Sequence, residues 1–319
     1  MRFPIVLSTD KNYVVPTYVA IHSLVRHTDK DTLDNIDIYI LCSGVDTESR
    51  DYFNNLGVNI KFVDVEMEKL NLNRELDYIS MATYYRLMIP DILVDYDRCL
   101  YLDSDLIVRD DITNLLLHPI KDYTIMGVKN YFSQEVFHEF YEQRCKECSI
   151  DTLDTYVNAG VLLVNLDRVR VTDTYSKMLD DLRINHYAYN DQDIINKYCY
   201  GRIGLMSVKY NFMVSYLKRI EKISEVLNES VLDVAHDPVI VHYASRKKPW
   251  RHRGYLMTDL WIDEVRNIKD TEALNKLVKP FIKESRRTLS FKEWIADEIK
   301  YIFRRCIQRS FIHTHQIVP

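Results

Sequence analysis

Two carboxylates separated by one residue follow an apolar run in the first half of the chain. Asp103 and Asp105 come directly after Leu100, Tyr101 and Leu102, which predict a buried strand. In an extended D-x-D segment both carboxylates point roughly to one side, so they can share one hard divalent cation such as Mg²⁺ or Mn²⁺. A cation also keeps both groups ionised, because adjacent unpaired carboxylates raise one another's pKa. Two solvated loop carboxylates would give the same pattern.

A histidine ends a second apolar run. His242 follows Val239–Val241 and precedes a basic segment that contains Lys248. A neutral imidazole can complete a Mn²⁺ site, and a lysine can neutralise phosphate. A histidine in such a run is also often a core residue with satisfied hydrogen bonds, so the metal role depends on its neighbours in the fold.

Further polar residues lie in apolar surroundings. Arg86 falls in a mostly apolar helical stretch, where an arginine usually needs an anionic partner, either structural or a bound phosphate or sugar. Asp191 and Gln192 precede the apolar pair Ile194–Ile195, which predicts a helix capped by Asn190 or Asp191.

These residues need a scaffold that brings them together. Short apolar runs alternate with helical patterns, which predicts an α/β fold with a mostly parallel central sheet and helices on both faces. The predicted strands cover residues 5–7, 36–40, 60–65, 99–102, 125–128, 161–164 and 239–241, and the predicted helices cover 46–55, 81–88, where Pro90 halts the helix, and a segment from Pro16. Ligands of such sheets bind beyond the carboxyl ends of the strands, which is where Ser8–Tyr13 and Asp103–Asp105 should lie.

Length and composition fit one large domain with an appendage. The chain has 319 residues, and we expect a catalytic domain over 1–265 and a helical, basic C-terminal region over 266–319. The net charge of -5 gives no whole-chain attraction to nucleic acid. Because no long apolar stretch or cleavage site follows Met1, we expect the chain to stay in the cytosol with its six cysteines reduced.

Together, these segments resemble glycosyltransferase family 8, which includes bacterial lipopolysaccharide galactosyl- and glucosyltransferases and, more distantly, glycogenin. The resemblance covers roughly residues 3 to 255 in order. It rests on Asp10, Asn12 and Tyr13, on Thr83–Leu87, on Leu100–Asp105, on Asn158–Leu163, on Asp191–Asp193, and on His242 with Lys248–Trp250. It implies a Rossmann-like nucleotide-diphospho-sugar transferase fold of the GT-A type.

The resemblance implies a retaining transfer of a hexose from UDP-galactose or UDP-glucose to a glycan or glycolipid acceptor, in lipopolysaccharide or other cell-surface glycan synthesis. Asp103, Asp105 and His242 would bind Mn²⁺ or Mg²⁺. The donor would contact Ser8, Asp10, Asn12, Tyr13, Arg86, Ser104, Asp105, Asn158, Ala159, Asp191, Gln192, His242, Ser245 and Lys248. Gln192 would hydrogen-bond the developing positive sugar, and Asp191 would be the nucleophile of a covalent route.

Two positions differ from the family pattern. Ser245 stands where family members commonly have glycine, in the loop near the diphosphate. Lys129 and Asn130 stand where the bacterial galactosyltransferases place an acidic residue near the sugar. The identity of the donor hexose is therefore open.

The C-terminal region carries an apolar stripe with basic residues around it. The stripe consists of Phe291, Trp294, Ile295, Ile299, Ile302, Phe303 and Cys306. A basic amphipathic helix with Trp and Phe fits the surface of an anionic membrane, and it equally fits a helix packed on the catalytic domain.

Two other functions are kept as alternatives. A Mg²⁺-dependent phosphohydrolase or phosphotransferase would use Asp103 as its nucleophile, since an aspartate pair after a strand also serves phosphoryl transfer. It leaves Asn158–Gly160 and Lys248–Trp250 unexplained. A catalytically silent sugar-nucleotide-binding protein would hold UDP with a metal and never turn over.

Overall fold

The computed structural model describes residues 2–66, 81–131 and 138–300. The chain forms two compact units, Met1–His242 and Tyr243–Pro319. The domain boundary that we predict near residue 265 lies inside the second unit and stays a prediction.

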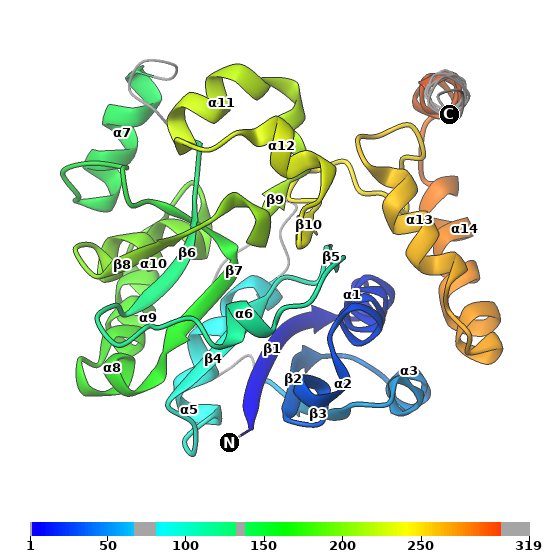
Figure 1. Ribbon diagram of the computed structural model, residues 1–319, viewed down its shortest axis with the longest axis horizontal. Coiled ribbons are helices and arrows are strands. Elements are labelled where there is room, and N and C mark those ends of the chain that lie inside the picture. The colour runs from blue at the N-terminus through cyan, green and yellow to red at the C-terminus, as the bar shows by residue number, and fades with distance from the viewer. Residues whose placement is uncertain (1, 67–80, 132–137, 301–319) are drawn as a thin grey trace, which may run out of the picture. The chain divides into compact units, whose positions relative to one another are not determined.

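The first unit is built on a seven-stranded sheet with the strand order β3-β2-β1-β4-β7-β6-β8 (Figure 1). Its strands are β1 (Phe3–Asp10), β2 (Ile36–Ser43), β3 (Asn59–Asp64), β4 (Arg98–Leu102), β6 (Ile125–Lys129), β7 (Val157–Asn165) and β8 (Ile203–Met206). Strands β3, β2, β1 and β4 are parallel, as are β6 and β8, whereas β7 is antiparallel to both of its neighbours. The prediction of a mostly parallel sheet is confirmed.

Helices and helical turns connect these strands. They are α1 (Val14–His27), α2 (Lys30–Leu33), α3 (Thr47–Asp51), η1 (Tyr52–Leu56), η2 (Met81–Met88), α5 (Ile89–Ile92), α6 (Thr113–Leu116), α7 (His138–Cys148), α8 (Leu166–Val171), α9 (Thr174–Ile184), α10 (Asn190–Cys199), η3 (Val208–Tyr210), η4 (Val214–Lys218), α11 (Ile220–Leu227) and α12 (Val231–His236). Pro90 lies in the first turn of α5, directly after η2. The predicted helix over 81–88 therefore ends at Met88 as expected, and Pro90 is accommodated in the next helix because a first-turn residue needs no backbone N–H donor.

Apolar side chains fill both faces of the sheet. In β1, Val6 points to one face and its neighbours Ile5 and Leu7 point to the other, because successive side chains alternate along a strand. All three are buried. Val6 belongs to a cluster with apolar residues of η2, α9 and α10, whereas α1 packs on β1 outside that cluster. The sheet is therefore covered on both faces, as the sequence predicts.

A second, three-stranded sheet has the order β5-β10-β9. Its strands are β5 (Leu106–Val108), β9 (Phe212–Met213) and β10 (Ile240–His242). Strand β10 is antiparallel to β5, with His242 directly opposite Leu106. Because Leu106 follows Asp105, this register brings His242, the last residue of the first unit, next to the D-x-D segment.

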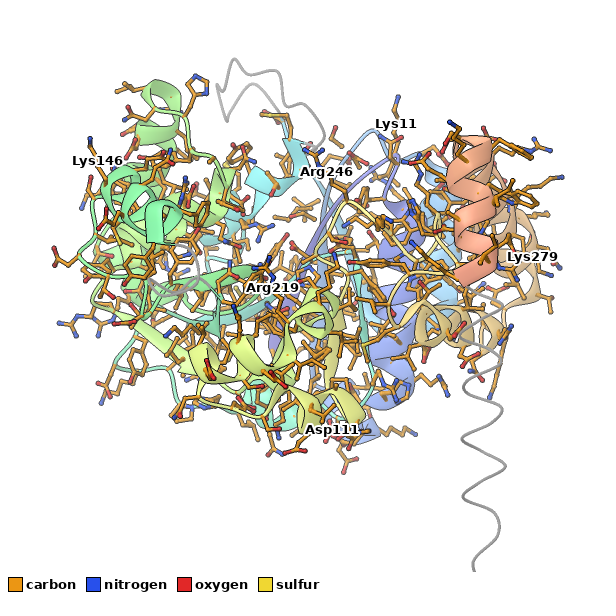
Figure 2. The ribbon with its side chains drawn as sticks, turned by 90° about the horizontal axis from the view of Figure 1, so that it is seen from above. Lys11, Asp111, Lys146, Arg219, Arg246 and Lys279 are labelled. Atoms are coloured by element: carbon orange, nitrogen blue, oxygen red, sulfur yellow. The ribbon has the colours of Figure 1, made fainter. Side chains whose placement is uncertain are left out.

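The second unit contains α13 (Thr258–Arg266), the π-helical turn η5 (Ala273–Val278), α14 (Lys279–Arg287) and a further helix over 291–300. Lys279, labelled in Figure 2, begins α14. The ring of Trp250 packs against Trp261 and Phe281, with centroid separations of 5.7 and 6.2 Å. Over the described part of the chain, no helix is both long enough and apolar enough to cross a membrane.

The helix over 291–300 exposes the first part of the predicted stripe. The exposed fractions are 74% for Phe291, 47% for Trp294, 37% for Ile295 and 61% for Ile299. Asp297, on another side of this helix, is buried. The other members of the stripe, Ile302, Phe303 and Cys306, lie outside the described residues.

Candidate active site

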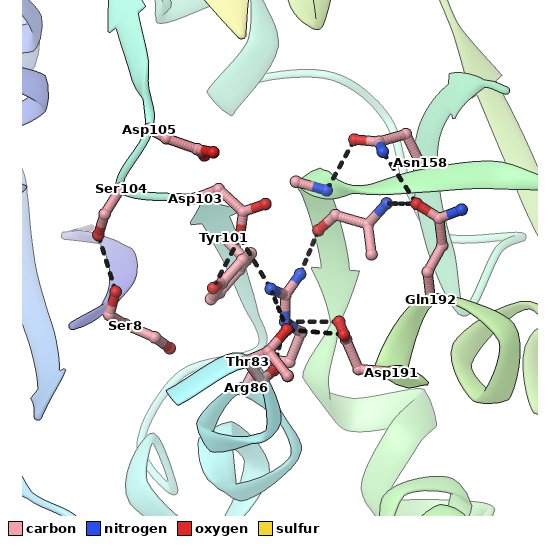
Figure 3. Close-up of polar contacts among 12 residues, drawn as sticks. Ser8, Thr83, Arg86, Tyr101, Asp103, Ser104, Asp105, Asn158, Asp191 and Gln192 are labelled. Carbon is pink, nitrogen blue, oxygen red and sulfur yellow. Dashed lines mark hydrogen bonds and ion pairs between the residues drawn. The ribbon is translucent and has the colours of Figure 1, made fainter. Parts of the chain in front are cut away.

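The D-x-D segment links β4 to β5. The backbone N–H of Asp103 donates to the carbonyl oxygen of Gly160 at 2.8 Å, which keeps the segment beside β7. The Ser104 hydroxyl donates to the carbonyl oxygen of Ser8 at 2.7 Å, and the side chains of Asp103 and Asp105 lie on the other side (Figure 3). This is the arrangement that an extended D-x-D predicts.

His242 completes a group of three side chains that could hold a metal ion. Its Nε2 lies 3.1 Å from Oδ1 of Asp105 and 3.6 Å from Oδ2 of Asp103. One ligand atom from each of the three residues lies within 4.8 Å of the others. His242 is buried, and its Nδ1 lies 2.8 Å from Oδ1 of Asn211. Two carboxylate oxygens and the Nε2 atom of the imidazole, which faces them, form a donor set that fits a divalent cation.

Gly160 allows the imidazole to lie against the backbone of β7. A Cβ atom at this position would lie 2.2 Å from Cε1 of His242 and 2.7 Å from Oδ2 of Asp103. Both distances are far below a van der Waals contact. Any side chain at position 160 would therefore displace the histidine or the aspartate.

Arg86 joins the D-x-D segment to α10. Its Nη2 donates to Oδ1 of Asp103 at 2.8 Å, and its Nε lies 3.0 Å from Oδ2 of Asp191. A third bond goes to the carbonyl oxygen of Ala159, and the guanidinium lies 4.1 Å from the ring centroid of Tyr101. The anionic partners of this arginine are thus two aspartates of the site, as Figure 3 shows.

Burial and charge act on this ion pair in opposite directions. Burial alone would lower the pKa of Arg86, but the charges of Asp191 and Asp103 raise it above its ordinary value. Burial raises the pKa of Asp191, and the positive charge of Arg86 and a hydrogen bond from Thr83 offset part of that rise. The hydroxyl of Thr83 lies 2.7 Å from Oδ1 of Asp191. Each charge of the pair therefore depends on the other.

Gln192 is held by hydrogen bonds at both ends of its amide. Its Oε1 accepts from Nδ2 of Asn158 at 2.9 Å and from the backbone N–H of Ala159 at 3.2 Å. Its Nε2 donates to the hydroxyl of Tyr156 at 3.2 Å. The start of β7 and the first turn of α10 are thereby locked together.

A buried ion pair holds the start of α10. Asp193 is paired with Arg144 of α7, and it also accepts from the hydroxyl of Tyr156 at 2.6 Å and the backbone N–H of Tyr189 at 2.8 Å. Tyr189 is the N-cap residue, and its side chain does not cap the helix. The prediction that Asn190 or Asp191 caps this helix is wrong, since the side chain of Asp191 bonds Thr83 and Arg86 instead.

The residues after β1 form a turn into α1. Oδ1 of Asp10 accepts from the backbone N–H of Asn12 at 2.8 Å, and the backbone N–H of Tyr13 donates to the carbonyl oxygen of Asp10 at 2.9 Å. Asp10 thus shapes the turn that presents Asn12 and Tyr13. Their contact with uridine stays a prediction.

Ser245 and Lys248 lie in the second unit. The Ser245 hydroxyl donates to the hydroxyl of Tyr255 at 3.0 Å, and Nζ of Lys248 donates to the carbonyl oxygen of Tyr243 at 3.0 Å. Their predicted contacts with the diphosphate stay predictions.

Asn211 is a site residue that the sequence analysis does not single out. It lies between η3 and β9, fully buried, with its amide between His242 and Asn158. A single asparagine before a two-residue strand carries no pattern of its own. Only the pairing of β9 with β10 places it beside the histidine.

Comparison with known proteins identifies the family of the chain. The family model described as glycosyl transferase family 8 matches residues 4–254. The chain is 25% identical over 285 residues to a lipopolysaccharide 1,2-glucosyltransferase of Escherichia coli, covering 84% of this chain and 80% of that protein. It is also 25% identical over 264 residues to a lipopolysaccharide 1,3-galactosyltransferase of Salmonella typhimurium, covering 79% and 74% of the two chains.

Two solved structures show the same fold. The galactosyltransferase LgtC, solved with donor and acceptor sugar analogs, has a TM-score of 0.67 and 25% identity, covering 82% of this chain and 95% of LgtC. The bifunctional glycosyltransferase WbbM, in its apo form, has a TM-score of 0.74 and 25% identity. This chain is covered to 90% in that comparison but spans only 52% of the WbbM chain. The expected GT-A type of fold is thereby confirmed.

Proposed function

Because this chain belongs to glycosyltransferase family 8, we propose that it transfers galactose or glucose from a UDP-sugar to an acceptor hydroxyl, with retention of the anomeric configuration. The observation that carries this proposal is the meeting of two groups of side chains. Asp103, Asp105 and His242 form one group, and Asp191 and Gln192 belong to the other. Arg86 connects the two groups directly.

The proposed metal is Mn²⁺, held by Asp103, Asp105 and His242. Bound there, the cation would act as a Lewis acid on the departing UDP diphosphate. The imidazole in the donor set supports Mn²⁺ over Mg²⁺, which prefers oxygen ligands. The protein's own part is to keep Nε2 of His242 and the two carboxylates within reach of one ion.

The proposed donor site extends to both sides of the metal ligands. Uridine is assigned to residues at the end of β1 and in the turn after it, namely Ser8, Asp10, Asn12 and Tyr13, with Ser104 beside them. The hexose is assigned to Asn158, Ala159, Asp191 and Gln192, and the diphosphate to Ser245 and Lys248. Arg86 would act on the sugar through Asp191, because its guanidinium already bonds Asp103, Asp191 and the carbonyl of Ala159.

The contacts of Asp191 and Gln192 support departure and attack on the same face of the sugar. A covalent route needs a nucleophilic oxygen with a free lone pair aimed at the anomeric carbon. Oε1 of Gln192 already accepts two hydrogen bonds. The charge of Asp191 is paired with Arg86, and its second oxygen accepts from Thr83. Both groups are better suited to stabilise an oxocarbenium-like state than to attack it.

A glycan or glycolipid of the cell surface is the proposed acceptor. The relatives named as lipopolysaccharide glucosyl- and galactosyltransferases support it. The exposed apolar residues of the 291–300 helix lie beside Lys292 and Lys300, which supports contact with an anionic membrane that carries a lipid-linked acceptor.

The experiment that tests the function measures UDP release from a panel of UDP-sugars with Mn²⁺ and a glycolipid acceptor extract. We expect release from one UDP-hexose, its loss on chelation of the metal, and its loss in Asp103→Asn and Asp105→Asn. Asp110→Asn is the matched control, because Asp110 is an exposed carboxylate in the same region and lies outside the metal group. This control should retain the native rate.

Other outcomes would favour the alternatives. Metal-dependent UDP binding without release from any donor would support the silent sugar-nucleotide binder. Trapping of a phosphoryl group on Asp103 would support the phosphohydrolase or phosphotransferase.

A further inference from the structure

A line of side-chain amides runs from His242 to the first turn of α10. Nδ2 of Asn211 donates to Oδ1 of Asn158 at 2.9 Å, and Nδ2 of Asn158 donates to Oε1 of Gln192 at 2.9 Å. At the other end, Oδ1 of Asn211 lies 2.8 Å from Nδ1 of His242. All four residues are buried. Three consecutive hydrogen bonds therefore connect the proposed metal ligand to the proposed sugar-site glutamine.

Two backbone N–H groups fix the direction of this line. The N–H of Gly160 donates to Oδ1 of Asn158 at 3.0 Å, and the N–H of Ala159 donates to Oε1 of Gln192 at 3.2 Å. A backbone N–H can only donate, so the atom it meets must be the amide oxygen and not the amide nitrogen. Neither amide can be turned over without placing two donors face to face.

The orientation of Asn158 sets that of Asn211. Since the oxygen of Asn158 faces Asn211, Asn211 must offer its Nδ2 there and its Oδ1 to His242. An amide oxygen only accepts, so Nδ1 of the imidazole must carry a proton. The other tautomer would set its Nδ1 lone pair against this oxygen. Nε2 is then the ring atom left for a cation between Asp103 and Asp105.

We propose that Asn211 is a positioning residue that holds the proton of His242 on Nδ1, keeps Nε2 ready as a metal ligand, and ties the metal site to the orientation of Gln192. The metal part of this inference rests on the proposed function. Partners that orient a metal-binding histidine usually contribute about 10–100-fold to metal affinity. Asn211 occupies that position here, with an amide in place of the more usual carboxylate.

Two variants separate the two roles of Asn211. Asn211→Leu removes both hydrogen bonds at similar volume, and we expect about a 10–100-fold loss of affinity for Mn²⁺ alone. Asn211→Asp keeps an acceptor for Nδ1 but puts an oxygen against Oδ1 of Asn158. It should therefore keep the native Mn²⁺ affinity while kcat for sugar transfer falls, because repulsion between the two oxygens moves Asn158 away from Gln192 and breaks their hydrogen bond.

Two measurements on the full chain without nucleotide test the inference. The signal of free Mn²⁺ in electron paramagnetic resonance gives the affinity for the ion. Nitrogen NMR of the histidine-labelled, metal-free chain shows which ring nitrogen of His242 carries the proton, with the resonance assigned by its absence in His242→Gln. We expect a proton on Nδ1 in the native chain, and in Asn211→Leu a proton on Nε2 instead, because Nε2 faces the carboxylate of Asp105 and Nδ1 has lost its acceptor.

Asn196→Leu is the matched control. Asn196 is another buried asparagine, and its side chain bonds the backbone of Val157 and Gln192. Its replacement should lower the stability and leave the Mn²⁺ affinity unchanged. If Asn211→Leu does not fold, the tautomer of His242 in the native chain and the behaviour of Asn211→Asp still test the proposed role of Asn211.

The inference and the proposed function fail in different ways. Native Mn²⁺ affinity in Asn211→Leu, or a proton on Nε2 alone in the native metal-free chain, would overturn the inference. Absence of Mn²⁺ binding by the native chain would overturn the proposed metal, whereas the tautomer result would still stand by itself.

Discussion

At Gly160 the backbone of β7 lies directly against the imidazole of His242. A Cβ atom there would meet both that ring and the carboxylate of Asp103. The imidazole cannot simply move aside to relieve this clash, because it is buried and bonded to Asn211. The geometry of the three metal-ligand side chains therefore depends on a residue that has no side chain.

We predict that Gly160→Ala lowers the affinity for Mn²⁺ by about 10-fold or more, because displacement of one ligand costs at least as much as loss of its orienting partner. Calorimetric titration of the nucleotide-free chain with Mn²⁺ measures this change. Gly204→Ala in β8 serves for comparison, since a Cβ there would also be crowded, but by Met126 and Tyr123, which do not belong to the proposed metal group. An equal loss of affinity in both variants would contradict the local explanation.

The sequence indicates the side chains of the proposed metal group better than the residues that support them. Asp103, Asp105 and His242 can be found because each follows an apolar strand, and the ends of strands are where ligands bind in such sheets. Asn211 does not follow an apolar strand, so no pattern marks it. The role of Gly160 depends on its contact with His242 of β10, which lies 82 positions later in the sequence. Contacts between segments so far apart leave no periodic pattern in the sequence.

At the scale of elements, α10 carries two proposed sugar-site residues on its first turn. That turn is held by the pair Arg144–Asp193, whose side chains are 2% and 0% exposed. Asp193 keeps hydrogen bonds to Tyr156 and Tyr189 even without the arginine, but its charge would then be unpaired in the interior.

We predict that Arg144→Met lowers the free energy of unfolding by about 3–5 kcal/mol, the usual cost of removing one partner of a buried ion pair. Urea denaturation measures it. Arg183→Met is the comparison, because the pair Arg183–Asp180 is exposed and should contribute about 0–1 kcal/mol. Similar losses in the two variants would mean that Asp193 does not need the arginine.

The sequence predicts where the strands form better than it predicts whether they run parallel or antiparallel. The apolar run of residues 161–164 predicts a strand, and β7 forms there, but the run says nothing about its antiparallel orientation. Direction is set by the connections and by pairing with β4 and β6. It matters for the site, because the start of an antiparallel β7 lies at the same edge as the end of β4, which brings Asn158–Gly160 beside Asp103.

At the scale of the whole molecule, the C-terminal helix presents apolar side chains to solvent. The exposure of Phe291 and Ile299 is high for residues of this type, and the stripe belongs to a region rich in lysine and arginine. An anionic bilayer can cover the stripe and attract the basic side chains at once.

We predict that the combined change Phe291→Ser, Trp294→Ser and Ile299→Ser abolishes binding to vesicles of phosphatidylglycerol and phosphatidylcholine, measured by co-sedimentation. High salt should weaken native binding, because the basic side chains contribute through screened charge. Leu205→Ser, which changes an exposed apolar residue of β8, should have no effect. Deletion from Ser285 onward should likewise release the chain from a membrane fraction, and unchanged partition in both variants would exclude this role.

The small sheet of β5, β10 and β9 also has a consequence for how the protein is made. Asp105 and His242 are 137 positions apart, so the ribosome synthesises Asp103 and Asp105 well before it reaches the histidine. At about 5–20 residues per second, the delay is on the order of ten seconds. A nascent chain that has completed β1 to β8 still lacks His242, the third side chain of the group proposed to bind Mn²⁺. In that proposal, the metal site becomes complete only after β10 has been synthesised and has paired with β5.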